Sequence, residues 1–222
     1  MSTKVTPCSN GEIRRKAKEA LRPKQKTMTL IALTFFGLVL AMALLSLVGV
    51  GQILSIIFNP IFTLGLCICS LLVVRNQELK VVDFFDGYRS FGRAIGLSLI
   101  NGILIFLWSL LLLVPGIIKS YSYSQCFYLL ADHPDMTGAE LREESEDLMD
   151  GNRMRLFRLQ LSFIGWFLLG ILTCGILLVI WVLPYWHTTM AQFYEELKKE
   201  NTPPAFVPLE GGEEPVNTTA SL

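Results

Sequence analysis

The chain has 222 residues, and its 19 Lys and Arg side chains balance its 19 Asp and Glu side chains. Hydrophobic residues make up 52% of the chain and charged residues only 17%, with a mean hydropathy of +0.48. Soluble domains average about 25% charged residues. The composition therefore argues against a soluble domain.

The charged residues are segregated along the chain. Residues 27–74, 94–118 and 159–194 form charge-free stretches of 48, 25 and 36 residues. A membrane-crossing helix needs about 20 apolar residues, so the first and last stretches are each long enough for two crossings. We therefore predict an all-α, polytopic transmembrane helix bundle with amphipathic helices at the membrane surface.

Residues 1–26 form a basic segment that holds eight Lys or Arg residues and two acidic residues. Ser9 and Glu12 fit a capping box, and the helix that follows carries Ile13 and Ala17 on one face. This pattern is typical of a helix that lies on an anionic leaflet; the alternative is a solvated tail that only sets orientation. The positive-inside rule places the N-terminus in the cytoplasm in either case.

The transmembrane domain is expected to occupy residues 27–197, beginning with spans at about 27–48 and 54–74. A Gly-Val-Gly-Gln sequence at 49–52 provides the turn between these two spans. Two crossings return the chain to the cytoplasm at Arg75, and a short interfacial segment follows.

Residues 94–131 pose the main topological question. As one helix they would measure about 57 Å, whereas the hydrocarbon core is about 30 Å thick. Two spans, 94–114 and 117–131, fit this length better if the chain turns at Pro115 and Gly116. The turn would face the outside.

Residues 137–150 are predicted to form an amphipathic surface helix. Leu141, Ser145 and Leu148 share one face, and acidic side chains cover the rest. The last charge-free stretch divides into spans at about 155–173 and 176–194. An acidic tail at 198–222 is expected to be disordered.

These segments add up to six spans in three hairpins, in a multi-pass protein of the cell membrane whose N- and C-termini both lie in the cytoplasm; five spans is the alternative. Gly87 and Gly151 each end an interfacial segment, and we expect each to form a left-handed helix cap. The basic residues expected to hold the cytoplasmic side are Arg14, Arg15, Lys16, Arg89, Arg93, Arg153, Arg155 and Arg158.

Several strings, in this order, resemble a bacterial membrane family known as domain of unknown function 975. They are FFDGYRSFGRA, FLWSLLLLVPGIIKSYSYS, LMDGNRMRLFRLQLSFIGWFLLGILTCGI and LPYWHTTMAQFYEEL, and the resemblance covers about residues 9–197. A more remote resemblance is to the membrane domain attached to some glycerophosphodiester phosphodiesterases. The resemblance implies a multi-span helical protein of the bacterial cell membrane, with no catalytic residues to carry over.

One charged residue, Lys119, falls within the predicted fourth span. Ionisable groups in a membrane are functional candidates, and Ser122, Tyr123 and Gln125 would line a polar seam with it. The plainer interpretation is that Lys119 reaches the nearby external surface and that its neighbours make interhelical hydrogen bonds. His187, after Pro184, is a further candidate, although a histidine bonded to a neighbouring helix is the commoner case.

No catalytic, metal-binding or cofactor-binding pattern stands out. We therefore expect a non-enzymatic interaction, scaffold or regulatory protein that acts at the cytoplasmic leaflet. Its expected partners are anionic membrane lipids and a protein, and not nucleic acid. A transporter of small solutes or lipids is the alternative, favoured by the Pro- and Gly-broken spans and by Lys119.

Overall fold

A computed structural model describes residues 8–47, 50–172 and 178–201, and every regular element within these ranges is helical. The predicted all-helical class is therefore confirmed for the described part of the chain. Its elements are α1 (Asn10–Leu21), η1 (Arg22–Lys24), α2 (Gln25–Ser46), α3 (Val50–Val74), η2 (Val81–Ser90), α4 (Phe91–Leu111), α5 (Leu113–Ser122), α6 (Cys126–Asp132), α7 (Gly138–Met149), α8 (Arg153–Leu161), α9 (Ile164–Leu172), η3 (Leu178–Val182) and α10 (Leu183–Asn201).

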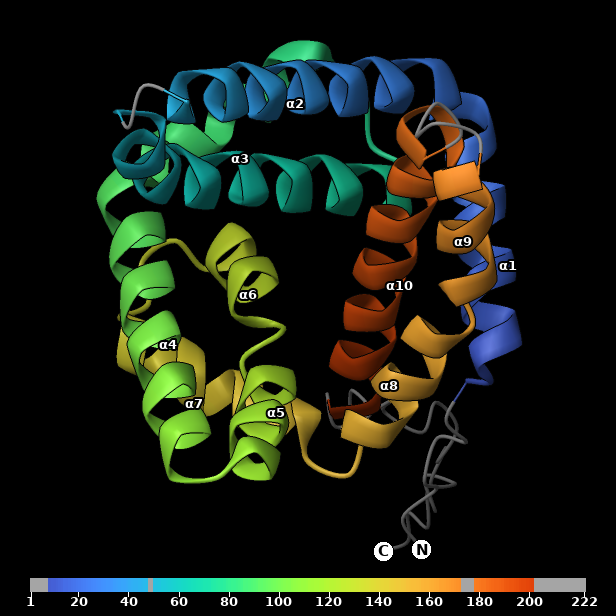
Figure 1. Ribbon diagram of the computed structural model, residues 1–222. Helices are drawn as coiled ribbons and strands as arrows, with labels where there is room; N and C mark the ends of the chain where they lie inside the picture. Colours follow the sequence, from blue (N-terminus) through green and yellow to red (C-terminus); the bar gives the residue numbers. More distant parts are fainter. Residues whose placement is uncertain (1–7, 48–49, 173–177, 202–222) are drawn as a thin grey trace, which may run out of the picture.

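Helices α2 and α3 lie side by side, and α4 and α10 run crosswise to them (Figure 1). Three stretches are long and apolar enough to cross a membrane: Asn10–Ser46, Leu54–Val74 and Val81–Leu111. They contain most of the first three predicted spans. A membrane protein is therefore indicated, but the six predicted spans are not confirmed.

The fourth and fifth predicted spans are not single helices. The fourth is interrupted between Ser122 and Cys126, which separates α5 from α6. Helix α5 has 10 residues, about 15 Å of helix, which is too short to cross the hydrocarbon core. The fifth predicted span is interrupted at Ser162 and Phe163, and part of the sixth, at 176–177, lies outside the described residues.

The break between α4 and α5 lies at Leu112, where the backbone is extended, with φ −158° and ψ 136°. We predicted this turn three residues later, at Pro115 and Gly116. Pro115 instead lies in the first turn of α5, where a residue without an N–H is tolerated. Gly116 faces α4, and a Cβ atom there would lie 2.7 Å from Cα of Ser109. The two residues therefore shape the contact between the helices rather than the turn.

The two glycines expected to be left-handed caps have different roles. Gly151 has φ +71° and comes directly after Asp150, the C-cap residue of α7. Gly87 lies inside η2 against α3, where a Cβ atom would be 2.6 Å from the carbonyl oxygen of Ile61 and 2.8 Å from the amide nitrogen of Gly65. Gly87 thus permits close backbone approach, and the predicted cap does not form there.

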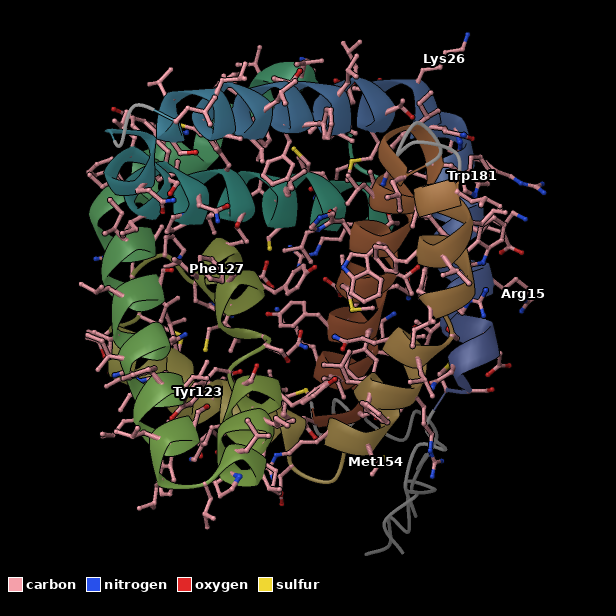
Figure 2. The ribbon with its side chains drawn as sticks, viewed as in Figure 1. Arg15, Lys26, Tyr123, Phe127, Met154 and Trp181 are labelled. Atoms are coloured by element: carbon pink, nitrogen blue, oxygen red, sulfur yellow. The ribbon has the colours of Figure 1, made fainter. Side chains whose placement is uncertain are left out.

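Helix α10 occupies the centre of the packing and contacts α1 and α3 most extensively. Phe193 and Tyr194 are fully buried, and the Tyr194 ring stacks on Tyr128 of α6. Phe127, also from α6, lies on the side of α4 (Figure 2).

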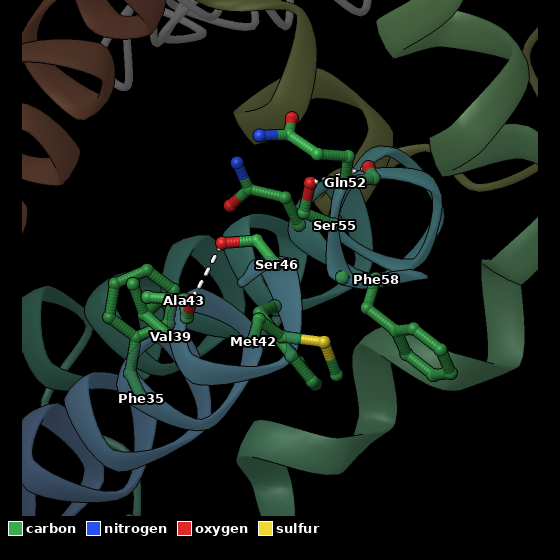
Figure 3. A pocket seen from close by; sticks show the side chains of 11 residues that line it. Phe35, Val39, Met42, Ala43, Ser46, Gln52, Ser55 and Phe58 are labelled. Atoms are coloured by element: carbon green, nitrogen blue, oxygen red, sulfur yellow. Dashed lines mark hydrogen bonds between the residues drawn. The ribbon is translucent and has the colours of Figure 1, made fainter. Parts of the chain in front are cut away.

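Helices α2 and α3 also border an open groove, lined by Ser46 and Gln52 near the end of their hairpin (Figure 3).

Replacing Gly116 by alanine should force α4 and α5 apart, because the added Cβ would meet the backbone of Ser109. We expect a loss of about 1–3 kcal/mol of stability, measured as a lower thermal unfolding midpoint of the purified protein in detergent. Gly92→Ala is the matched control, since a Cβ at Gly92 meets nothing within 4 Å. Equal midpoints for the two variants would contradict the proposed role of Gly116.

Candidate functional site

The structure brings together four of the five residues expected to form a polar seam. Lys119 and Ser122 lie on α5, Tyr123 and Gln125 follow directly, and all face α7. The Ser145 hydroxyl of α7 donates a hydrogen bond to the Ser122 carbonyl oxygen at 2.6 Å. It accepts one from the backbone N–H of Gln125 at 3.3 Å. The seam is therefore a junction between α5 and α7.

Lys119 is paired within this junction. Its Nζ lies 2.7 Å from Glu146 Oε1 and 5.9 and 5.6 Å from the ring centres of Trp108 and Tyr123. Burial by itself would raise the pKa of Glu146, but the hydrogen bond from Lys119 holds that pKa below its ordinary value. Lys119 is therefore not the lone charge that we expected but forms an ion pair with α7.

The same contact bears on topology. We expected Lys119 near the outer surface and residues 137–150 at the cytoplasmic surface. A direct ion pair between Lys119 and Glu146 cannot join points separated by a hydrocarbon core of about 30 Å. These two expected locations are therefore incompatible with this structure.

His187 lies apart from the seam, on α10. It packs among Met28 of α2, Leu66 of α3 and Pro184 of its own helix. This surrounding is apolar and leaves no room for a water-sized molecule. The structure therefore favours a packing role for His187.

The basic residues expected to hold the cytoplasmic side fall into three groups. Arg14, Lys16 and Arg155 make contacts inside the protein. Arg15 and Arg158 are exposed. Ion-pair distances of 3.7–3.9 Å to nearby aspartates are found for Arg89, Arg93 and Arg153.

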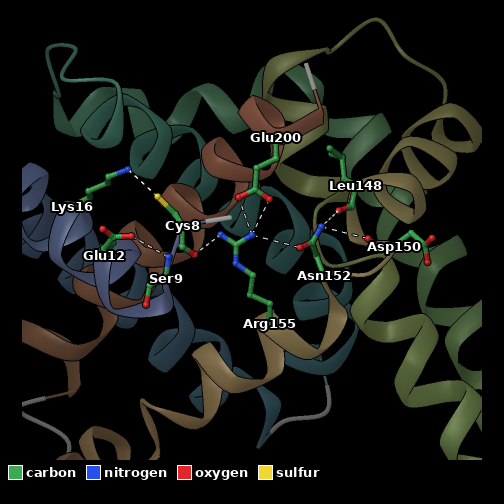
Figure 4. A network of polar contacts seen from close by, with 9 residues as sticks. All are labelled: Cys8, Ser9, Glu12, Lys16, Leu148, Asp150, Asn152, Arg155 and Glu200. Atoms are coloured by element: carbon green, nitrogen blue, oxygen red, sulfur yellow. Dashed lines mark hydrogen bonds and ion pairs between the residues drawn. The ribbon is translucent and has the colours of Figure 1, made fainter. Parts of the chain in front are cut away.

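Arg155 has the most partners in this set. Its guanidinium forms two hydrogen bonds of 2.9 and 3.0 Å with Glu200 and one of 2.8 Å with the carbonyl oxygen of Cys8 (Figure 4). It also lies 5.5 Å from the ring centre of Phe193. Arg155 thus ties α8 to α10 and to the segment before α1.

The C-terminal half of α10 carries four charged residues that reach four different parts of the chain. We call Glu195, Glu196, Lys198 and Glu200 the α10 collar. Their partners are Arg75 after α3 at 2.6 Å, Lys16 of α1 at 3.0 Å, Asp132 of α6 at 2.9 Å and Arg155 of α8 at 2.9 Å.

Asp132 is the most buried acid in the collar contacts, with its side chain 5% exposed. It accepts hydrogen bonds from Arg75 at 2.7 Å, Lys198 at 2.9 Å and the Tyr194 hydroxyl at 3.0 Å. Burial alone would raise the pKa of Asp132, but the hydrogen bonds from Arg75 and Lys198 hold it below its ordinary value. Asp132 is therefore an ionised acid inside the protein.

Sequence reasoning missed the collar. Asp132 and Arg75 are 57 residues apart, and each stands at the end of an apolar run, where a charged residue normally meets solvent or lipid headgroups. The charged residues after Tyr194 repeat at helical spacing, but helical spacing does not identify their partners.

Asp132→Asn should destabilise the protein, because Arg75 and Lys198 would lose a buried countercharge. We expect a loss of about 3 kcal/mol or more at neutral pH, measured by thermal unfolding in detergent. Asp135→Asn is the control, since that side chain is fully exposed. An equal effect of the two substitutions would contradict the structural role of Asp132.

The stabilities of wild type and Asp132→Asn should depend differently on pH. Because the folded-state pKa of Asp132 is lowered, its carboxylate stabilises the fold above its ordinary pKa, and this contribution is lost as the pH falls through the lowered value. The stability gap between wild type and Asp132→Asn should therefore narrow below about pH 4. A stability gap that stays constant well below pH 4 would argue against an ionised Asp132.

Comparison with known proteins assigns the family. The sequence model described as "Protein of unknown function (DUF975)" matches residues 8–118 and 110–201, so the chain belongs to this family, as its sequence strings predicted. No curated protein and no solved structure matches the chain. The family carries no assigned activity, so the function has to be argued from the structure.

Proposed function

We propose that this member of the DUF975 family is a non-enzymatic interaction or scaffold protein that acts at the cytoplasmic leaflet of the cell membrane. In this proposal, anionic lipids hold the N-terminal region at the membrane surface, and both termini lie in the cytoplasm. A protein partner meets the acidic outer face of α7.

The observation that carries the proposal is the outward side of α1, η1 and α2. Its exposed residues are first charged, with four basic residues against the acids Glu12 and Glu19, and then apolar. The change takes place within one helical turn, between Lys26 and Leu30. Arg15 and Lys26 lie at the periphery of the molecule (Figure 2). The basic set is Arg15, Lys18, Arg22 and Lys26, and the apolar set includes Leu30, Leu33, Leu40, Leu44 and Leu47.

This change in character fits the boundary between lipid headgroups and hydrocarbon. Lys and Arg near an anionic surface are each attracted by about 1 kcal/mol, whereas exposed leucines are stabilised in hydrocarbon. The opposite face of α1, with Ile13, Ala17 and Leu21, is buried against α10. Because this apolar face packs inside the protein, the proposed attraction to the leaflet rests on the basic residues alone.

The acidic face of α7 is the proposed protein-binding surface. Leu141, Ser145 and Leu148 are buried, as the pattern at 137–150 predicted for one face. Glu143, Glu144 and Asp147 remain exposed. A partner segment rich in Lys or Arg has the complementary charge.

The transporter alternative rested on the Pro- and Gly-broken spans and on Lys119 as a lone charge within a span. The second of these supports is lost, because Lys119 is paired with Glu146 of α7. We therefore do not propose transport.

The lipid contribution can be measured with the full-length protein in nanodiscs, made with or without anionic phosphatidylglycerol. Wild type should unfold at a higher temperature in anionic discs. Replacing Arg15, Lys18, Arg22 and Lys26 by glutamine should abolish most of that increase in unfolding temperature. The expected loss of stabilisation is about 1 kcal/mol for each positive charge removed.

A charge-retaining variant provides the control. Arg15→Lys, Lys18→Arg, Arg22→Lys and Lys26→Arg together change the side chains but keep four positive charges. This variant should respond to anionic lipid as wild type does. If the glutamine variant responds equally well, these four basic residues do not hold the protein at an anionic leaflet.

A further inference from the structure

Two grooves meet along the N-terminal half of α3. The first has a volume of about 360 Å³ and lies between α2 and α3. The second, of about 480 Å³, lies between α3 and α4, with Phe127 of α6 in its wall. Ser55 and Asn59 line both grooves. They lie one helical turn apart, so they form a shared ridge, here called the α3 ridge.

The walls of both grooves are mainly apolar. In the first, Val39, Met42 and Phe58 lie to one side, and the polar side chains of Ser46, Gln52 and Ser55 gather on the other (Figure 3). Apolar side chains dominate the α4 side of the second groove, namely Ile95, Leu99, Ile103 and Phe106. Each groove therefore offers an apolar channel beside a polar ridge.

The α3 ridge has unused hydrogen-bonding capacity. The Ser55 hydroxyl donates to the Gln52 carbonyl oxygen at 2.7 Å and keeps its acceptor sites. The exposed Asn59 side chain has no hydrogen bond among the described residues. Because this side chain is exposed, its amide donor and acceptor are accessible to hydrogen-bonding partners from outside the protein. A ligand with neutral polar groups would provide them.

None of the residues that line the two grooves is ionisable. The site therefore offers no countercharge for a phosphate or a carboxylate, which would be costly to bring into apolar surroundings. Hydroxyl and ester oxygens fit this lining better. Two apolar channels on either side of one ridge also match a ligand with two acyl chains better than one with a single chain.

We propose that the α3 ridge and its two grooves bind a neutral two-chain amphiphile of the diacylglycerol type. Its glycerol hydroxyl and ester oxygens bond to Asn59 and Ser55, and one acyl chain lies in each groove. This site is separate from the basic residues Arg15, Lys18, Arg22 and Lys26. The proposal therefore does not rest on the proposed attraction to anionic lipid.

The test is binding of a diacylglycerol, with a fluorophore at the end of one acyl chain, to the delipidated full-length protein in detergent. Asn59→Leu should weaken binding about fivefold to tenfold, because it removes hydrogen bonds to the ligand. Gly102→Leu fills the second groove and should weaken binding at least as much. A Cβ at Gly102 meets nothing within 4 Å, so this change should leave the fold intact.

Gly92→Leu is the matched control, because Gly92 lies on the same helix in equally open space, away from both grooves. It should bind the probe as wild type does, and so should the glutamine variant of α1. Similar thermal unfolding midpoints for all variants would show that they are folded. If Gly102→Leu binds like Gly92→Leu, the second groove holds no acyl chain and the proposal fails.

Competition tests the chemistry of the ligand. Unlabelled diacylglycerol should displace the probe at lower concentration than oleic acid or phosphatidylglycerol. If oleic acid competes equally well, a single chain is sufficient and the two-groove arrangement is wrong. If phosphatidylglycerol competes equally well, the neutral lining does not select against a charged headgroup and the assignment to a neutral amphiphile is wrong.

Discussion

The ion pairs of the α10 collar are the interaction on which the rest of the architecture depends. Glu195, Glu196, Lys198 and Glu200 connect one helix to α1, to the end of α3, to α6 and to α8. Helices α6 and α8 have only 7 and 9 residues, and helices this short are not stable alone. Removing the cations would leave the buried carboxylates without countercharge, so these pairs favour the gathering of the four segments around α10.

The packing of the two amphipathic helices also determines which of their surfaces remain exposed. Both amphipathic helices direct their apolar faces inward, α1 against α10 and α7 against its neighbours α5 and α6. Their outer faces carry opposite charges, basic on α1 and acidic on α7. In the proposed function, lipid and protein would therefore meet these two helices through charge, whereas the apolar surface of α2 and the grooves beside α3 offer hydrophobic contact.

Hydropathy alone overestimated how continuous the helices are. A charge-free stretch meets the criterion for a membrane span whether or not it is straight, so residues 117–131 and 155–173 looked like spans. The structure interrupts them after Ser122 and at Ser162, where packing against α7 and α10 takes precedence over helical continuity. The turn predicted at Pro115 and Gly116 moved to Leu112 for a related reason, because Gly116 is required where α5 crosses close to Ser109.

The sequence by itself determined the features that depend on near neighbours: the helical class, the capping box at Ser9, and the buried face of α7. These follow from spacings of three or four residues, which place side chains on one helical face or at one helix end. Only the tertiary structure decided that Lys119 meets Glu146 and that Asp132 meets Arg75. The members of these pairs are 27 and 57 positions apart in the chain. In the sequence alone, any residue of opposite charge is an equally good candidate partner, and only the fold brings one of them within reach.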